Sequence, residues 1–202
     1  MSRFFIVLAL WNASLILHAQ NTPASLPPET PAEFSVWSQR LDLSRYIGKK
    51  YRLTAAIRAE GDGPESFAIA FIRNEPPAGG LRSWTYMDNM MDRPVRDTLW
   101  KVYTLQYVVD QKAPWIAFGV LAYGSGKFYY DDLQLAVEES PDKWTPISIP
   151  NGDFEQEGID PWQQTAQGVP VRTLGAQATL DAERAFNGRQ CLRIMNRFLS
   201  QK

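Results

Sequence analysis

Apolar and polar residues alternate along much of this chain, and that alternation limits the folds it can adopt. In the segment 51–60, Tyr51, Leu53 and Ile57 are apolar, whereas Arg52 and Thr54 between them are polar. Successive side chains of a strand point to opposite faces of a sheet, so the pattern predicts a strand with one buried face. The same pattern predicts strands at 36–43, 66–74, 100–109, 115–123 and 127–137.

Turns rich in glycine and proline separate these segments. They lie at 61–64, 76–80 and 124–126, and no long segment carries an apolar stripe of helical period. Short strands at this spacing indicate an all-β chain, and we predict an antiparallel jelly-roll β-sandwich. The 202 residues are 45% hydrophobic, which is enough to build a buried core.

The N-terminus has the pattern of an export signal. Residues 1–20 place Arg3 before an apolar stretch, and a proline-containing breaker follows without stop-transfer charges. We expect a signal peptide at 1–20 cleaved after Ala19 or Gln20, a proline-rich linker at 21–33, and a secreted, periplasmic or cell-envelope protein with no membrane span after cleavage. The alternative is an uncleaved N-terminal anchor.

The counts of histidine and cysteine exclude several kinds of chemistry. His18 is the single histidine and lies in the predicted signal, and Cys191 is the single cysteine. Triads that need histidine, zinc sites with histidine ligands and an intrachain disulfide are therefore not expected in the mature protein. The net charge of −1 gives no basic surplus for nucleic acid.

The last fifty residues allow two domain divisions. A segment from 150 to 202 with few strands cannot bury much core alone. We prefer a single module over 34–202, in which this segment completes the sandwich. The alternative is a module at 34–139 followed by a truncated second module at 150–202.

Several short motifs resemble the galactose-binding-like jelly rolls of carbohydrate-binding modules of families 4, 9 and 22. The chain has an Asn-Gly-Asp-Phe-Glu opening at 151–155, Trp162, and a Gly-Arg-Gln-Cys-Leu-Arg-Ile strand at 188–194. The closing half of the pattern, with Gly-Lys-Lys-Tyr at 48–51 and Tyr-Asp-Asp at 130–132, comes first, so we expect a permuted strand order. The run 88–94 with 119–126 is also similar to accessory modules beside secreted bacterial tail-processing serine peptidases.

The resemblance implies a structural calcium ion near the aspartates of 131–132. Apolar positions change parity from Phe128 and Tyr130 to Leu133 and Leu135, which predicts a bulge there. Oxygen ligands suit a hard cation such as calcium. The candidate ligands are Asp132 and Glu155, then Asp131 and Asp153; the alternative is that these carboxylates bind backbone amides or arginines.

Aromatic residues next to polar ones are the candidate ligand-binding residues. A sugar ring packs its C–H face on Trp or Tyr, and its hydroxyls need polar partners. The segment 82–89 offers both kinds, and Arg82, Trp84, Tyr86 and Asp88 share one face if it is extended. The alternative is that Trp84 and Tyr86 cover the sandwich core.

Other aromatic residues fall within predicted strands. Trp115 and Tyr123 have the opposite parity to Phe118 and form a second pair of ligand candidates. Four more are predicted to be core residues, and Cys191 is predicted to be an inert thiol within a strand. Those four are Trp100, Tyr103, Tyr107 and Phe118.

Three functions are consistent with these features. The first is a non-catalytic module that binds carbohydrate or a cell-surface glycan. The second is a protein-interaction or structural accessory module of a peptidase-like system. A hydrolase ranks third, because no serine lies in a nucleophile elbow and no glycine-rich phosphate loop is present.

Overall fold

The alternating segments form strands of two packed sheets in the computed structural model, which describes residues 29–30, 33–78, 84–166, 169–170 and 172–198. A short 3-10 turn at Ser44–Tyr46 follows the second strand. The strands are β1 (Glu29–Thr30), β2 (Phe34–Asp42), β3 (Lys50–Gly61), β4 (Phe67–Glu75), β5 (Tyr86–Asp88), β6 (Lys101–Val108), β7 (Trp115–Tyr123), β8 (Gly126–Ser140), β9 (Lys143–Ile147), β10 (Gln163–Ala166), β11 (Val169–Pro170), β12 (Arg172–Thr173), β13 (Ala176–Asp181) and β14 (Cys191–Asn196).

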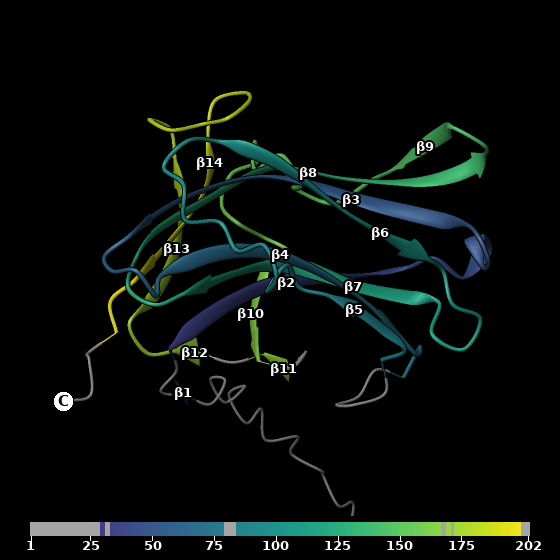
Figure 1. Cartoon of the computed structure of the whole chain (residues 1–202), viewed down its shortest axis with the longest axis horizontal. Helices are drawn as coiled ribbons and strands as arrows, with labels where there is room; N and C mark the ends of the chain where they lie inside the picture. Colours follow the sequence, from purple (N-terminus) through teal and green to yellow (C-terminus); the bar gives the residue numbers. More distant parts are fainter. Residues whose placement is uncertain (1–28, 31–32, 79–83, 167–168, 171, 199–202) are drawn as a thin grey trace, which may run out of the picture.

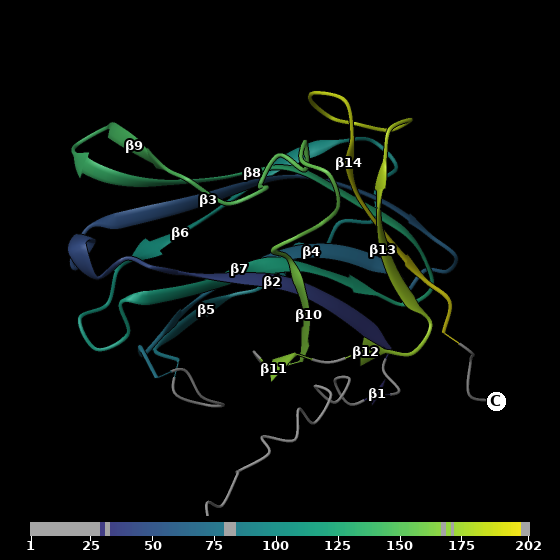
Figure 2. The ribbon, with the colours of Figure 1, turned by 180° about the vertical axis from the view of Figure 1, so that it is seen from behind.

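The two large sheets lie one above the other in Figure 1, and Figure 2 shows them from behind. The lower sheet has the strand order β11-β10-β2-β7-β4-β5, and the upper sheet has the order β13-β14-β8-β3-β6, with β9 also paired to β8. Pairing within both is antiparallel, whereas β1 and β12 form a separate parallel pair. The prediction of an all-β antiparallel sandwich is confirmed.

The predicted strands agree closely with the observed ones. The segment 115–123 matches β7 at both ends, and 127–137 lies within the longer β8. The predicted turn at 124–126 joins these two strands. Gly126 has a φ of 144°, and a Cβ there would lie 2.6 Å from the carbonyl oxygen of Glu60, so this turn requires glycine.

The core between the sheets contains side chains from both parts of the chain. Trp162 stands edge-on to Phe118 with ring centroids 5.9 Å apart, and it also packs against Phe154 at 5.4 Å. Strand β14 lies between β13 and β8, and its Leu192 and Ile194 are fully buried in the same core. Residues after 150 therefore contribute to the core that residues 34–137 form.

Hydrogen bonds inside the sandwich join the two sheets. The Tyr130 hydroxyl of the upper sheet donates to the Leu121 carbonyl of the lower sheet at 2.7 Å. Asn196 at the end of β14 accepts from the Ser35 hydroxyl at 2.8 Å and donates to the Ala122 carbonyl at 3.0 Å. Because buried polar groups are costly without partners, these bonds favour one alignment of the sheets.

The predicted signal peptide lies outside the described residues, as does most of the predicted linker. The described part of the chain has no helix with the length and apolar character that a membrane span requires.

Replacement of Ile194 by alanine should test how much the C-terminal segment adds to stability. Ile194 is fully buried, so Ile194→Ala should lower the free energy of unfolding by about 2–5 kcal/mol, whereas Leu174→Ala at an exposed site should change it by less than about 0.5 kcal/mol. Urea denaturation followed by circular dichroism measures both. Equal effects of the two substitutions would contradict this account of the core.

Candidate functional site

The candidate site lies beside a β-bulge in β8. Thr54 of β3 faces Gln134 of β8, but Ala56 faces Asp131, so β8 has one residue more than β3 between the two pairs. Asp132 has a φ of 49°, the left-handed conformation that a bulged residue often takes. The predicted bulge at the aspartates is confirmed.

The bulge separates two partners along one edge of β8. Strand β14 pairs with residues 126–130, and β9 pairs with residues 135–140. In the gap between them the Leu133 amide donates to the Gly152 carbonyl at 2.9 Å. A Cβ on Gly152 would lie 2.6 Å from the Leu133 carbonyl oxygen, so glycine allows this close approach.

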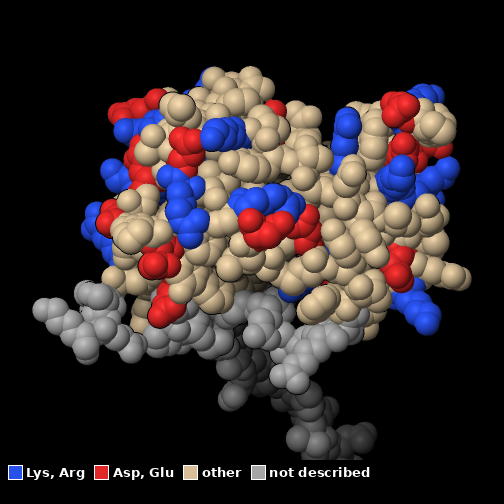
Figure 3. All heavy atoms as spheres, in the orientation of Figure 1, with Lys and Arg blue, Asp and Glu red and all other residues tan. Residues whose placement is uncertain are grey.

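A groove opens on the outer face of the upper sheet beside this gap. Its volume is about 600 Å³, and Figure 3 shows a notch in the outline of the molecule on the side of β9. Residues of β3 and β8 form the floor, and residues of β9 and of the segment 148–156 form the walls. The side chains best suited to ligand contact are Arg52, Thr54, Asp132, Gln134, Trp144, Asp153 and Gln156.

Arg52 and Trp144 form the central pair of this groove. The guanidinium carbon of Arg52 lies 4.4 Å from the centroid of the Trp144 ring, a cation–π arrangement. Among the described residues Arg52 has no hydrogen bond or ion pair, so its N–H groups remain available to a ligand. Gln134 and Asp132 bond to each other at 2.8 Å on the floor.

Two of the predicted calcium ligands accept hydrogen bonds from the loop between β13 and β14. Asp131 is buried, and its carboxylate accepts from the Phe186 amide at 2.9 Å and the Asn187 amide at 3.0 Å. Glu155 accepts from the amides of Arg189 at 2.7 Å and Gln190 at 3.0 Å. For these two carboxylates the structure agrees with the alternative, in which they bind backbone amides.

The surroundings shift the pKa values of Asp131 and Glu155 in opposite directions. Burial raises the pKa of Asp131 above its usual value, although backbone amides that bind it act in the opposite direction. The amides of Arg189 and Gln190 lower the pKa of Glu155, and the Arg189 guanidinium adds to that effect.

The other two predicted calcium ligands, Asp132 and Asp153, line the groove. Asp153 accepts from the Glu155 amide at 3.3 Å. Within the described residues no three side chains of His, Cys, Asp or Glu are grouped so that they could hold a metal ion. The four predicted ligands are therefore divided between two places, and calcium stays a prediction from the resemblance.

The four residues of the predicted ligand face at 82–88 have different surroundings in the structure. Tyr86 packs against the core edge and stacks on Tyr107 of the other sheet at 3.4 Å between centroids. Asp88 binds Arg93 at 2.6 Å. Trp84 is exposed, and Arg82 lies outside the described residues. For Tyr86, covering the core is the role that the structure shows.

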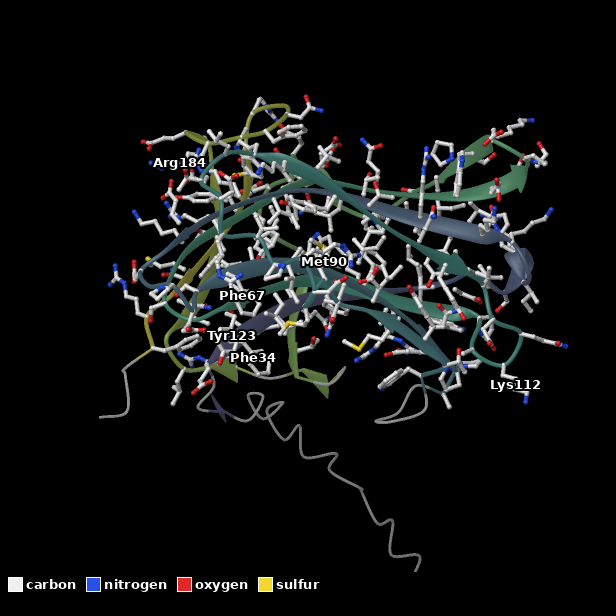
Figure 4. All side chains as sticks on the ribbon, viewed as in Figure 1. Phe34, Phe67, Met90, Lys112, Tyr123 and Arg184 are labelled. Atoms are coloured by element: carbon white, nitrogen blue, oxygen red, sulfur yellow. The ribbon has the colours of Figure 1, made fainter. Side chains whose placement is uncertain are left out.

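The second predicted pair lies on the outer face of the lower sheet. Trp115 packs under the Arg40 guanidinium at 4.9 Å. Tyr123 stacks on Phe67 at 4.9 Å and is the register partner of Phe34 in β2, and Figure 4 shows these three rings at one end of the sheet. The parity prediction is confirmed, but Trp115 and Tyr123 lie far apart along β7, at its two ends.

The predictions for other side chains had mixed outcomes. Phe118 is fully buried as predicted. Cys191 lies in β14 as predicted and is fully buried there, and burial raises the pKa of its thiol to about 12. Tyr103 is half-buried against the core, and Tyr107 is 41% exposed at its edge. The prediction for Trp100 was wrong: it precedes β6 and packs on Phe186 and on the buried Tyr129, outside the core between the sheets.

Sequence reasoning missed Trp144. It lies among Pro141, Pro146 and Pro150, and this proline content indicates a loop rather than a strand. Arg52 was placed on the exposed face of its strand, but no feature of the sequence links it to a residue as distant as Trp144.

Comparisons with known proteins give limited similarity. No protein-family model matches the chain. The uncharacterized HTH-type transcriptional regulator YbfP of Bacillus subtilis (strain 168) is 30% identical over 127 residues, which are 62% of this chain and 39% of that protein. The chain thus spans about two fifths of that relative's length.

A solved structure described as "CBM4 structure and function" also has some similarity. It is 18% identical and has a TM-score of 0.34, covering 50% of this chain and 59% of the other. This similarity is too weak to carry an argument, so the two-sheet architecture rests on the strand pairing of the chain itself.

The role of Glu155 can be tested through the pH dependence of stability. A carboxyl group whose pKa is lowered by folding adds stability above its ordinary pKa of about 4.3, and that stability is lost as the pH falls. The protein should melt at a higher temperature than Glu155→Gln at pH 7, and the difference should disappear in acid.

Glu157→Gln is the matched control, because Glu157 is an exposed neighbour. Asp131 is present in all three proteins, so its opposite effect cancels in the comparison. A difference between the protein and Glu155→Gln that does not change with pH would contradict the proposed role of the carboxylate charge.

Proposed function

We propose that this protein is a non-catalytic binding module that holds carbohydrate in the groove of the upper sheet. The observation that carries the proposal is the Arg52–Trp144 pair, which places an indole ring and unused N–H donors in one groove of about 600 Å³. An indole ring suits the C–H face of a sugar, and donors and acceptors around it suit the hydroxyls.

The floor of the groove has the polar groups that this ligand class needs. Thr54 and Gln134 project from neighbouring strands, where they face each other in register. Asp132 adds an acceptor on the same side, and Gln156 contributes an amide from the wall. A rigid sheet that positions these groups lowers the entropic cost of holding a polar ligand.

We further propose that binding takes place outside the cytoplasm, in the secreted, periplasmic or cell-envelope compartment. The support is the N-terminal segment, which has the pattern of an export signal. A glycan or another cell-envelope component is then the partner to expect.

A second candidate function is protein docking next to β5. Trp84, Met87 and Met91 are exposed within a few residues of each other, and clustered exposed apolar side chains are typical of interaction surfaces. This candidate corresponds to the accessory-module hypothesis, and it would use a surface different from the groove.

Substitution of Trp144 should separate the two candidates. The probe is a panel of soluble neutral and acidic oligosaccharides, first screened on an array and then titrated by calorimetry. For any oligosaccharide that binds, Trp144→Ala and Arg52→Ala should each weaken binding about tenfold or more, which corresponds to about 1.4 kcal/mol.

Trp84→Ala is the control, because Trp84 is exposed and is absent from the groove lining. It should leave sugar affinity unchanged. If no oligosaccharide binds, or if Trp84→Ala and not Trp144→Ala abolishes binding, the groove is not the glycan site. Release of new reducing ends during the titration would overturn the non-catalytic assignment.

A further inference from the structure

β6 forms one free edge of the upper sheet. β6 pairs with β3 on one side, and no other strand of the described chain pairs with it. Figure 1 shows β6 at the front of the sandwich, where β5 forms the corresponding edge of the lower sheet. An edge strand offers a row of backbone N–H and C=O groups to any extended partner. On β6 one of these groups, the Val108 carbonyl, also accepts from the Asn74 side chain at 3.0 Å.

The other sheet edges have features that discourage pairing. β5 has three residues and β11 has two, so both are short. β9 contains Pro146, and β13 has six residues, two fewer than β6. β6 has eight residues, and it contains no proline, no glycine and no charged residue except Lys101 at its start. Among the described edges, β6 is the longest and least protected.

Several apolar side chains at the two ends of this edge are exposed, and the polar Thr104 and Gln106 lie between them. Val102 is 56% exposed, and Leu99 just before the strand is 68% exposed. Tyr107 and Val108 at the other end are also exposed. Apolar side chains at both ends of an open edge favour a partner that covers the whole strand.

We propose that β6 pairs with β6 of a second copy of this chain, antiparallel and centred on Leu105. In this register Val102 faces Val108 of the second copy, Thr104 faces Gln106, and Tyr103 faces Tyr107. Every pair keeps the parity that β6 has against β3, so core-facing residues stay on the core side.

The register is self-complementary in both packing and charge. Each Lys101 faces Val109 of the second copy, so the two lysines lie at opposite ends and do not meet. Val102 and Val108 face each other directly, as do Tyr103 and Tyr107, and such aliphatic and aromatic pairs favour pairing. The net charge of −1 per chain adds little repulsion between copies. These features point to a second copy as the occupant of the edge.

Pairing of this kind joins two upper sheets into one continuous sheet. The two-fold axis is perpendicular to that sheet, since the strands run antiparallel edge to edge. Both outer faces therefore lie on the same side of the dimer. This inference does not depend on what the groove binds.

The test measures molar mass by light scattering and by sedimentation over a dilution series of the protein. The protein should have twice the monomer mass of 22.9 kDa, or twice the mass of the mature chain if the signal is removed, and should dissociate on dilution. Val102→Asp with Val108→Asp places like charges opposite each other twice per dimer, and should raise the dissociation constant about tenfold or more.

The matched control combines Val102→Lys with Val108→Asp. The same two positions then carry opposite charges across the two-fold axis, and the dimer should form again. Circular dichroism and melting curves confirm that each exposed substitution leaves the fold intact. A protein that stays monomeric at every concentration overturns the proposal, as does a dimer whose mass is unchanged by Val102→Asp with Val108→Asp.

Discussion

The bulge at Asp132 is the constraint on which the upper sheet depends. A non-glycine residue with a positive φ costs about 1–3 kcal/mol and persists only where its surroundings fix it. Here the Asp131 carboxylate accepts from the Asp132 amide at 2.7 Å, and the next residue, Leu133, donates to Gly152. Because the bulge interrupts the edge of β8, β14 and β9 lie on the same edge, and the groove opens beside them.

Carboxylates near the bulge stabilise loops by accepting hydrogen bonds. Asp131 and Glu155 together accept from four amides between Phe186 and Gln190, so the loop from β13 to β14 is fixed from two sides. Hydrogen bonds from amides to an ionised carboxylate are charge-assisted and stronger than those between neutral groups. Asp131 and Glu155, which are predicted metal ligands in the sequence, thus fix the loop between β13 and β14 in the structure.

The fold was predictable from the sequence to a large extent, because period-two alternation reports directly which face of a strand is buried. The segment 115–123 shows this most clearly, with every second side chain from Ile116 to Ala122 in the core. The parity change after Tyr130 even located the bulge. Trp100 misled because it precedes its strand, where alternation no longer reports the buried face.

The groove was much less predictable, because its residues come from segments far apart in the sequence, and no sequence pattern indicates that these segments meet. Arg52 and Trp144 meet only because β9 folds back along β8 while β3 pairs with its other edge. The prolines around Trp144 conceal this short strand. Tyr86 misled for another reason: its polar neighbours indicated a surface, but its ring is held by Tyr107 of the opposite sheet.

The position of β14 has a consequence for the order in which the chain can fold. β14 is an inner strand of the upper sheet, yet it comes from residues close to the C-terminus, and its Asn196 binds Ser35 across 161 positions of sequence. Contacts of such high sequence separation form late and slow folding. The sandwich cannot close until residues 191–196 are available, so a nascent chain lacking β14 exposes one edge of β8 and the core side chains that Leu192 and Ile194 cover.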